Sequence, residues 1–177
     1  MTTATQTYTS ANTSVNSKRL PAIYKKIDWY KLKVKYGDKY GDLAVLDIGA
    51  GKYTQHIKEY IESKGGEYIP YDPYNLSPAD NLYASANFHR ANVIICSNVF
   101  NVIKEEKVIY DLHNMIRSYR VPYFISVYEG DKSWIGHETK KGCWQRNEEI
   151  YAYILNVHEG VFNRVITDSN YSCFIYC

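Results

Sequence analysis

Val45-Leu-Asp-Ile-Gly-Ala-Gly51 indicates a buried strand that ends in a glycine turn and leads into a helix. Residues 43–48 form a continuous apolar run broken only at Asp47, as expected for a strand covered on both faces. Gly49 and Gly51 permit backbone angles closed to other residues and let a ligand approach the main chain. Amides at the start of the following helix are unpaired and suit polar or anionic groups. The segment therefore predicts an α/β fold with a ligand site at this turn.

Two classes of cofactor site use such a turn. A dinucleotide site needs a glycine or alanine at the sixth motif position, where this chain has Thr54, so that fingerprint fails. A methyltransferase site has an acidic residue two places before the first glycine, and Asp47 stands there. Asp72 follows the next expected strand and would accept hydrogen bonds from both ribose hydroxyls. The alternative is a glycine turn that serves only close packing between helix and strand.

The rest of the chain alternates between strand and helix patterns. Strands are expected at 43–48, 68–71, 93–97 and 123–128, and helices within 18–40 and at 53–64, 104–119 and 146–156. Residues 161–167 and 171–176 flank a turn and predict an antiparallel hairpin at the end of the chain. These patterns predict a Rossmann-like, mostly parallel sheet flanked by helices, with the hairpin at its edge.

Composition fits one domain of 177 residues, with an ordinary hydrophobic fraction of 45%. Residues 1–16 are rich in Thr, Ser and Asn and are expected to form a flexible polar tail, before a single domain at 17–177. Within that domain, 17–42 is a basic, aromatic, helical segment and 43–177 is the core. The net charge of +2 means that any basic surface must be local.

The chain carries no pattern typical of a metal site, an exported protein or a membrane span. Its four cysteines form no CxxC pair and have no histidine at zinc spacing, and Cys96 lies within an apolar run as a small core residue. The N-terminus lacks the apolar stretch of a secretory signal, and the apolar runs are too short to cross a bilayer. We expect a cytoplasmic protein without a metal.

Five stretches together resemble the class I methyltransferases, and within them those associated with DNA phosphorothioation and phage DNA-modification systems. They are SKRL at 17–20, LDIGAG at 46–51, YDPY at 71–74, NVFNVI at 98–103 and TKKGCWQ at 139–145. The resemblance runs from about residue 13 to about residue 153. It implies a compact methyltransferase core and an enzyme that uses S-adenosyl-L-methionine.

The expected cofactor pocket collects residues from three strand ends. These residues are Asp47, Gly49, Gly51, Tyr53, Asp72, Tyr74, Ser97 and Asn98. Methyltransferases often have a glycine where this chain has Tyr53, and a ring there would narrow the space for the methionine tail. Only twenty residues separate Asp72 from Val93, so the usual helix and strand are expected to be shortened or lost. A loop at residues 82–85 would then cover the adenine.

Asn98 and Asn101 follow the third expected strand, where a catalytic loop should lie. An amide oxygen there would accept a hydrogen bond from an exocyclic amine and position its lone pair for methyl transfer. Equally, Asn98 could cap a turn and Asn101 the helix at Lys104. His137 is the one histidine in a loop near the expected site, and none of the five histidines has a partner at metal-ligand spacing.

Lys132, Lys140, Lys141, Trp144 and Arg146 combine cations with an indole ring. The last four are the expected substrate-binding residues, which would contact phosphates and stack on a base of DNA or RNA. The plainer interpretation is a solvated loop. The predicted function is methylation of a nucleic acid or nucleotide in a phage or mobile-element setting. Two alternatives stay open: a degenerate fold that binds cofactor or a partner protein without turnover, and a small-molecule methyltransferase.

Overall fold

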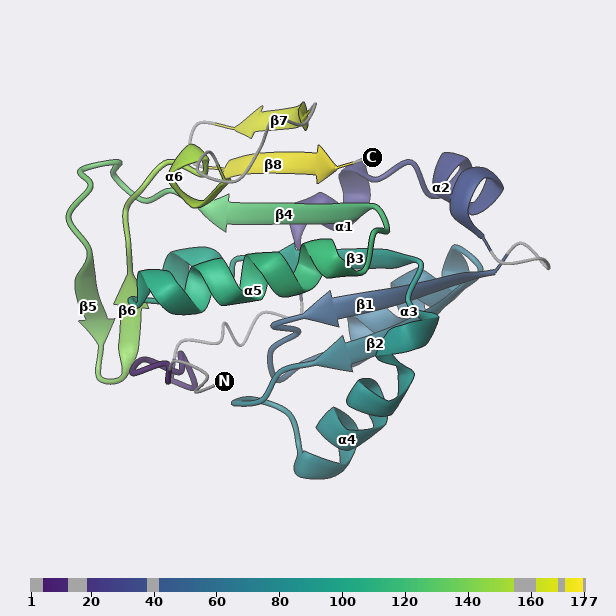
Figure 1. The fold of residues 1–177 in the computed structure, drawn as a ribbon, viewed down its shortest axis with the longest axis horizontal. Coiled ribbons are helices and arrows are strands. Elements are labelled where there is room, and N and C mark those ends of the chain that lie inside the picture. Colours follow the sequence, from purple (N-terminus) through teal and green to yellow (C-terminus); the bar gives the residue numbers. More distant parts are fainter. Residues whose placement is uncertain (1–4, 13–18, 38–41, 155–161, 169–170, 177) are drawn as a thin grey trace.

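The computed structural model describes residues 5–12, 19–37, 42–154, 162–168 and 171–176. Within these ranges, six strands form one sheet in the order β2-β1-β3-β4-β8-β7 (Figure 1). They are β1 Leu43–Ile48, β2 Gly66–Tyr71, β3 Val93–Ser97, β4 Tyr123–Tyr128, β7 Phe162–Asp168 and β8 Tyr171–Tyr176. Strands β1 to β4 pair in parallel, whereas β8 pairs antiparallel with β4 and with β7. The predicted Rossmann-like sheet with an antiparallel edge is confirmed.

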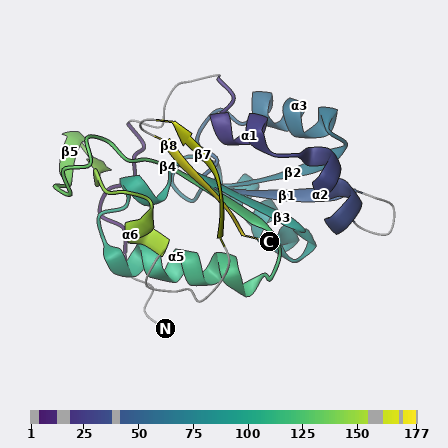
Figure 2. The same cartoon turned by 90° about the horizontal axis from the view of Figure 1, so that it is seen from above.

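Helices cover both faces of this sheet (Figure 2). On one face lie α1 Ala22–Lys26, α2 Trp29–Tyr36 and α3 Gln55–Ser63. On the other lie α4 Pro78–Asn87, α5 Glu106–Ser118 and α6 Tyr151–Ile154. Two short 3₁₀ turns, η1 Phe88–Arg90 and η2 Phe100–Val102, follow α4 and β3. No helix in the described part of the chain is long and apolar enough to cross a bilayer.

Strand β1 is buried at every position because both of its faces meet helices. Leu43 and Val45 belong to the cluster formed with α1 to α3, whereas Leu46 and Ile48 belong to the cluster formed with α5. This arrangement explains why its apolar run does not alternate with polar residues. Asp47 interrupts the run at the end of the strand that meets the site.

The helical segment expected within residues 18–40 is two helices instead of one. Ile27 has an extended backbone between them, and Asp28 begins α2 by accepting a hydrogen bond from the Lys31 amide at 2.9 Å. This side-chain cap favours a new helix start over continuation. Tyr30 is exposed, although it follows the buried Ile23 and Ile27 at helical spacing.

The helix expected at 146–156 is also wrong over its described part, since within residues 146–154 only α6 is helical. Arg146 donates its amide to the Asn101 carbonyl at 2.9 Å, and Asn147 has a left-handed φ of 55°. Neither arrangement belongs inside an α-helix. Upstream, the segment expected as a basic loop contains a separate hairpin, β5 His137–Lys140 and β6 Cys143–Gln145.

Residues 82–85, expected as a loop, lie inside α4. Ser77 caps this helix by accepting a hydrogen bond from the Asp80 amide at 3.1 Å, and Pro78 occupies its first turn. Ala84 lies on the face of α4 that packs on the sheet and is fully buried. Cys96 is a buried core residue, as predicted. Between β2 and β3 the chain therefore contains a helix, α4, but no additional strand.

Residues 5–12 lie in the segment expected to be a flexible tail, yet they have packing partners. The Tyr8 ring lies 5.2 Å from the Trp144 ring, and the Ser10 amide donates to the Gly142 carbonyl at 3.3 Å. Asn12 donates to the Lys141 carbonyl at 3.0 Å. These contacts connect the segment to the β5–β6 hairpin, which its polar composition did not predict.

Candidate functional site

A cavity of about 1060 Å³ lies where the carboxyl ends of the parallel strands converge. Strand β1 lies between β2 and β3 in the sheet. The connection from β1 leads to β2 on one side, and the chain then returns to β3 on the other side, so the order of the strands reverses at β1. Such switch points collect ligands in open α/β sheets. In Figure 1 the arrowheads of β1, β2 and β4 point toward the β5–β6 hairpin at this end.

The structure brings the expected cofactor residues together around this cavity. Its lining includes Asp47, Gly49, Gly51, Tyr53, Asp72, Tyr74, Ser97 and Asn98, and also Asn101 and Trp144. Tyr53 and Tyr74 are both more than one-third exposed, so their rings stand at the rim. The Ser97 hydroxyl lies 3.0 Å from that of Ser126.

The two glycines of the turn differ in their surroundings. A Cβ at Gly49 would lie 2.2 Å from Val99 Cγ2, so close packing excludes a side chain there. A Cβ at Gly51 would meet nothing within 4 Å, although its φ of 74° disfavours other residues. Gly49 therefore fits the alternative of a packing turn, whereas Gly51 leaves open space beside the main chain.

The amides of this turn already have partners. The Gly49 and Ala50 amides donate to the Tyr71 carbonyl at 2.7 and 3.3 Å, and the Gly51 amide donates to Asp72 Oδ2 at 3.0 Å. These bonds join the end of β1 to the end of β2. A ligand at the turn would therefore contact Cα atoms more than these amides.

Asp47 is a buried carboxylate at the base of the cavity, with 2% of its surface exposed. The Tyr68 hydroxyl donates to Asp47 Oδ2 at 2.6 Å. Burial raises the pKa of Asp47 to about 6, while interactions with the hydroxyls of Tyr68 and Tyr24 oppose that rise and the charge of Asp72 adds to it. Asp47 is thus a carboxyl group that changes charge near pH 6.

Asp72 holds its own loop, which was not expected. Its Oδ1 accepts from the Tyr74 and Asn75 amides, and its Oδ2 accepts from the Gly51 amide and from Asn75 Nδ2, each at 3.0 Å. Four hydrogen bonds fill the acceptor sites of a carboxylate. With 5% of its surface exposed, Asp72 has no free site for both ribose hydroxyls in this arrangement.

Asn98 does not cap a turn and Asn101 does not cap a helix, because neither Oδ1 accepts a hydrogen bond from the described residues and α5 begins after Glu105. Asn98 has a left-handed φ of 57°, and its backbone N–H donates to the Ser126 carbonyl at 2.7 Å. The side-chain oxygens of Asn98 and Asn101 are buried without a hydrogen-bond partner among the described residues. The expected catalytic loop therefore presents two unsatisfied acceptors.

The expected substrate residues separate into two groups. Trp144 lines the cavity, whereas Lys140 and Lys141 are exposed on the hairpin away from it. Arg146 is buried, lies 2.9 Å from Glu148 Oε1 and donates to the Lys104 carbonyl at 2.8 Å. Its guanidinium is occupied by these structural contacts, so the expected phosphate contact has no free group there.

Two further residues of the expected loop have structural partners. Lys132 lies 2.7 Å from Glu129 Oε2. His137 lies outside the cavity lining, and its Nδ1 is 3.1 Å from Asn147 Nδ2.

Sequence reasoning missed several residues of the site. Gln145 lines the cavity beside Asn101, and its position within the TKKGCWQ stretch was the only signal for it. Asn75 completes the loop held by Asp72, and Gln6 reaches the cavity from the N-terminal segment. Long-range contacts of this kind leave no periodic trace in the sequence.

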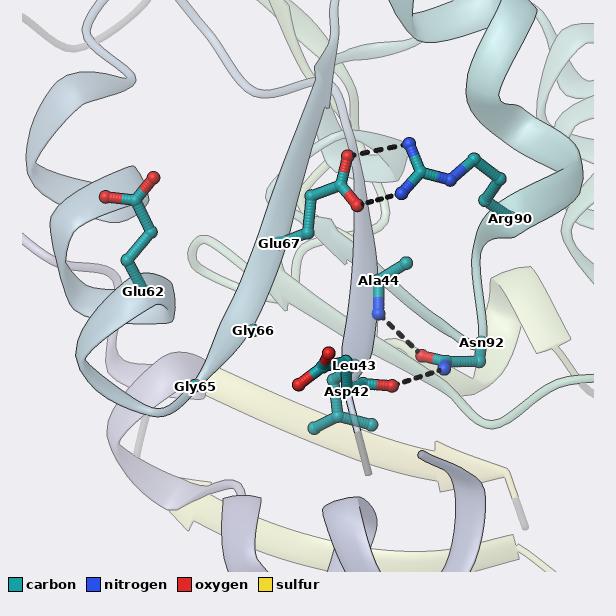
Figure 3. A pocket seen from close by; sticks show the side chains of 9 residues that line it. All are labelled: Asp42, Leu43, Ala44, Glu62, Gly65, Gly66, Glu67, Arg90 and Asn92. Atoms are coloured by element: carbon teal, nitrogen blue, oxygen red, sulfur yellow. Dashed lines mark hydrogen bonds and ion pairs between the residues drawn. The ribbon is translucent and has the colours of Figure 1, made fainter. Parts of the chain in front are cut away.

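A second hollow, of about 630 Å³, lies at the amino ends of β1 and β2 (Figure 3). Arg90 pairs with Glu67, and Asn92 bonds both the Ala44 amide and the Asp42 carbonyl. Arg90, Glu67 and Asn92 therefore have structural partners within the hollow, and Glu62 lies 3.8 Å from Lys58 outside it. The first cavity is therefore the candidate functional site.

No family model and no curated protein matches the sequence. Among solved structures, one titled "DhpI-SAH complex structure" has 7% sequence identity and a TM-score of 0.45. The match covers 86% of this chain and 95% of that chain.

Proposed function

We propose that this protein is an S-adenosylmethionine-dependent methyltransferase. The observation that carries the proposal is the open space beside Gly51, in a cavity at the switch point of a parallel sheet. A left-handed glycine with free space at its Cβ position is what a ligand needs in order to approach the main chain. Close packing alone accounts for Gly49 but leaves the glycine at position 51 without a packing reason.

The chemistry of the lining fits a cationic cofactor. S-adenosylmethionine supplies a methyl group already activated by a positively charged sulfur. Asp47 gives the cavity a carboxylate above about pH 6. Tyrosine ring faces also attract cations, and the tyrosines of the lining are Tyr24, Tyr53, Tyr71, Tyr74 and Tyr128.

The ribose contact is assigned to a different residue from the expected one. Both oxygens of Asp72 are occupied, whereas Asn75 Oδ1 has no partner among the described residues. Asn75 also lines the cavity. We therefore assign to the Asn75 amide the acceptor role predicted for Asp72, with Asp72 as the residue that orients Asn75.

The substrate side of the cavity favours a small molecule. Arg146 is neutralised by Glu148, and Gln6, Thr9 and Ser10 line the cavity from the N-terminal segment. A nucleic-acid substrate in a phage or mobile-element setting is the second candidate, supported by the exposed Lys140 and Lys141. Binding without turnover is the third, supported by the Tyr53 ring at the rim.

A labelled-methyl transfer screen tests the proposed function. The purified protein is incubated with S-adenosylmethionine carrying a labelled methyl group and with small aromatic amines and phenols, DNA, RNA or protein. We expect transfer to a small molecule. Transfer to DNA or RNA would support the second candidate, and cofactor binding without transfer to any class would support the third.

A further inference from the structure

An unsatisfied acceptor oxygen lies on the wall of the cavity formed by η2 and β6. Asn101 lines the cavity with 3% of its surface exposed, and its Oδ1 has no hydrogen-bond partner among the described residues. Buried polar atoms in folded proteins almost always have a partner, so such an atom calls for an explanation. A bound ligand that donates a hydrogen bond supplies one.

The orientation of this amide is fixed by a relay from the main chain. Gln145 Nε2 donates to the Tyr128 carbonyl at 3.0 Å, and Asn101 Nδ2 donates to Gln145 Oε1 at 3.2 Å. A carbonyl can only accept, so Gln145 must turn its nitrogen to Tyr128 and its oxygen to Asn101. Asn101 must then use its nitrogen toward Gln145, which leaves its oxygen as the unsatisfied atom.

Among the described residues, two cations close to this wall are already engaged. Arg146 contacts Glu148 and the Lys104 carbonyl, and Lys104 lies 4.9 Å from the Trp144 ring centroid. Val102 and Ile103 add apolar surface beside Asn101. Apolar surface beside the neutral Asn101 acceptor favours an uncharged donor over a phosphate or a carboxylate, because an anion there would be desolvated without a partner.

We propose that this wall binds a small, uncharged aromatic molecule through an N–H or O–H group that Asn101 Oδ1 accepts, with Gln145 as the positioning residue. The inference rests on the proposed function only in naming this molecule as the methyl acceptor. The acceptor oxygen orients the donor group, and the apolar side chains hold the ring.

Calorimetric titration with two matched probes tests the inference. The probes are 3-aminoacetophenone and acetophenone, which differ by one neutral amine, and each is titrated with and without saturating S-adenosylhomocysteine. One hydrogen bond to a neutral acceptor predicts about 3- to 10-fold tighter binding of the amine. Equal affinities, or no binding of either probe at millimolar concentration, would overturn the inference.

Two variants connect the preference to the relay. Asn101→Leu removes the acceptor, and Gln145→Met removes the group that orients it; in both, the affinity ratio of the two probes should fall to about one. Continued binding of acetophenone by each variant demonstrates a folded cavity. If Asn101→Leu does not fold, Gln145→Met alone tests the inference. Tighter binding of the amine than of acetophenone in folded Gln145→Met, as in the wild type, would contradict the inference.

Two further titrations separate this inference from the proposed function. Failure of S-adenosylhomocysteine to bind while the amine preference persists would contradict the proposed function and leave the donor site standing. A single-stranded DNA or RNA oligonucleotide is the third ligand. Tight, salt-dependent binding that Asn101→Leu abolishes would assign the wall to a nucleic acid and overturn the small-molecule inference.

Discussion

Asp47 titrates in the folded protein at a higher pH than in the unfolded chain. Burial raises its pKa from 3.8 to about 6, so the native state holds this proton more tightly. The resulting stability is fully present below about pH 4 and is lost as the pH rises through 6. By linkage, a difference of this size corresponds to about 3 kcal/mol.

We therefore expect Asp47→Asn to flatten part of the pH dependence of unfolding. Relative to the wild type, the variant should gain up to about 3 kcal/mol between pH 4 and pH 7, because asparagine does not ionise. Urea unfolding of both proteins across this range measures the gain. A difference between the two proteins that stays constant with pH would show that Asp47 does not titrate as described.

Gly49 and Gly51 provide a matched pair of positions. Alanine at either position must adopt a left-handed backbone, which should lower the free energy of unfolding by about 1–2 kcal/mol. At Gly49 the new Cβ also overlaps Val99, which should cost about 1–3 kcal/mol more. We expect Gly49→Ala to be the less stable variant by chemical denaturation, and Val99→Ala to restore part of the loss. Equal losses without rescue would contradict the packing role of Gly49.

The loop after β2 is an element held by one carboxylate. Asp72→Ala removes four hydrogen bonds, and we expect it to lower the free energy of unfolding by about 2–4 kcal/mol. Cofactor affinity should fall as well, because Asn75 loses its support. A variant of wild-type stability that binds S-adenosylmethionine about 2–3 kcal/mol more weakly would instead point to direct ribose contact by Asp72.

The β5–β6 hairpin and the segment after it carry two kinds of basic residue. Arg146→Ala breaks a buried ion pair and should lower unfolding stability by about 3–5 kcal/mol. The double change Lys140→Ala and Lys141→Ala, on the exposed side of the hairpin, should leave thermal stability nearly unchanged. Equal stability of the wild type, Arg146→Ala and the double variant would contradict the structural role of Arg146.

A flatter salt dependence of DNA binding in the double variant would support the second candidate function.

Elements with continuous apolar runs could be predicted from the sequence almost to the residue. Both β3 and β4 begin and end where the sequence predicts, because each is buried on nearly all sides. The helix expected at 146–156 was wrong because Asn147 and the bond from the Arg146 amide to Asn101 depend on tertiary contacts. The residues expected to bind a cofactor line one cavity, whereas the four hydrogen bonds to Asp72 depend on a loop conformation that no spacing encodes.

At the scale of the whole molecule, the N-terminal segment connects parts of the chain that are far apart in sequence. Thr7 donates its amide to Glu105 Oε1 at 3.2 Å, and Tyr8 packs on Trp144. Lys52, beside the glycine turn, donates to the Ala11 carbonyl. The segment thus bridges the hairpin, the start of α5 and the turn over one side of the cavity.

Removal of residues 1–12 should open this side of the cavity. We expect S-adenosylhomocysteine to dissociate severalfold faster, while unfolding stability changes by less than about 1–2 kcal/mol, since these hydrogen bonds are largely exposed. Stopped-flow displacement measures the rate. An unchanged rate in the shortened protein would show that the segment does not limit ligand exit.

Calorimetric titration of the wild type and of Gly51→Val with S-adenosylmethionine shows whether the space beside Gly51 holds this cofactor. The valine side chain would occupy that space with only the moderate loss of stability expected for a strained backbone. We expect one-to-one binding by the wild type and at least about 100-fold weaker binding, or about 2.7 kcal/mol, by the folded variant. Absence of binding by the wild type, or equal affinity in the variant, would contradict it.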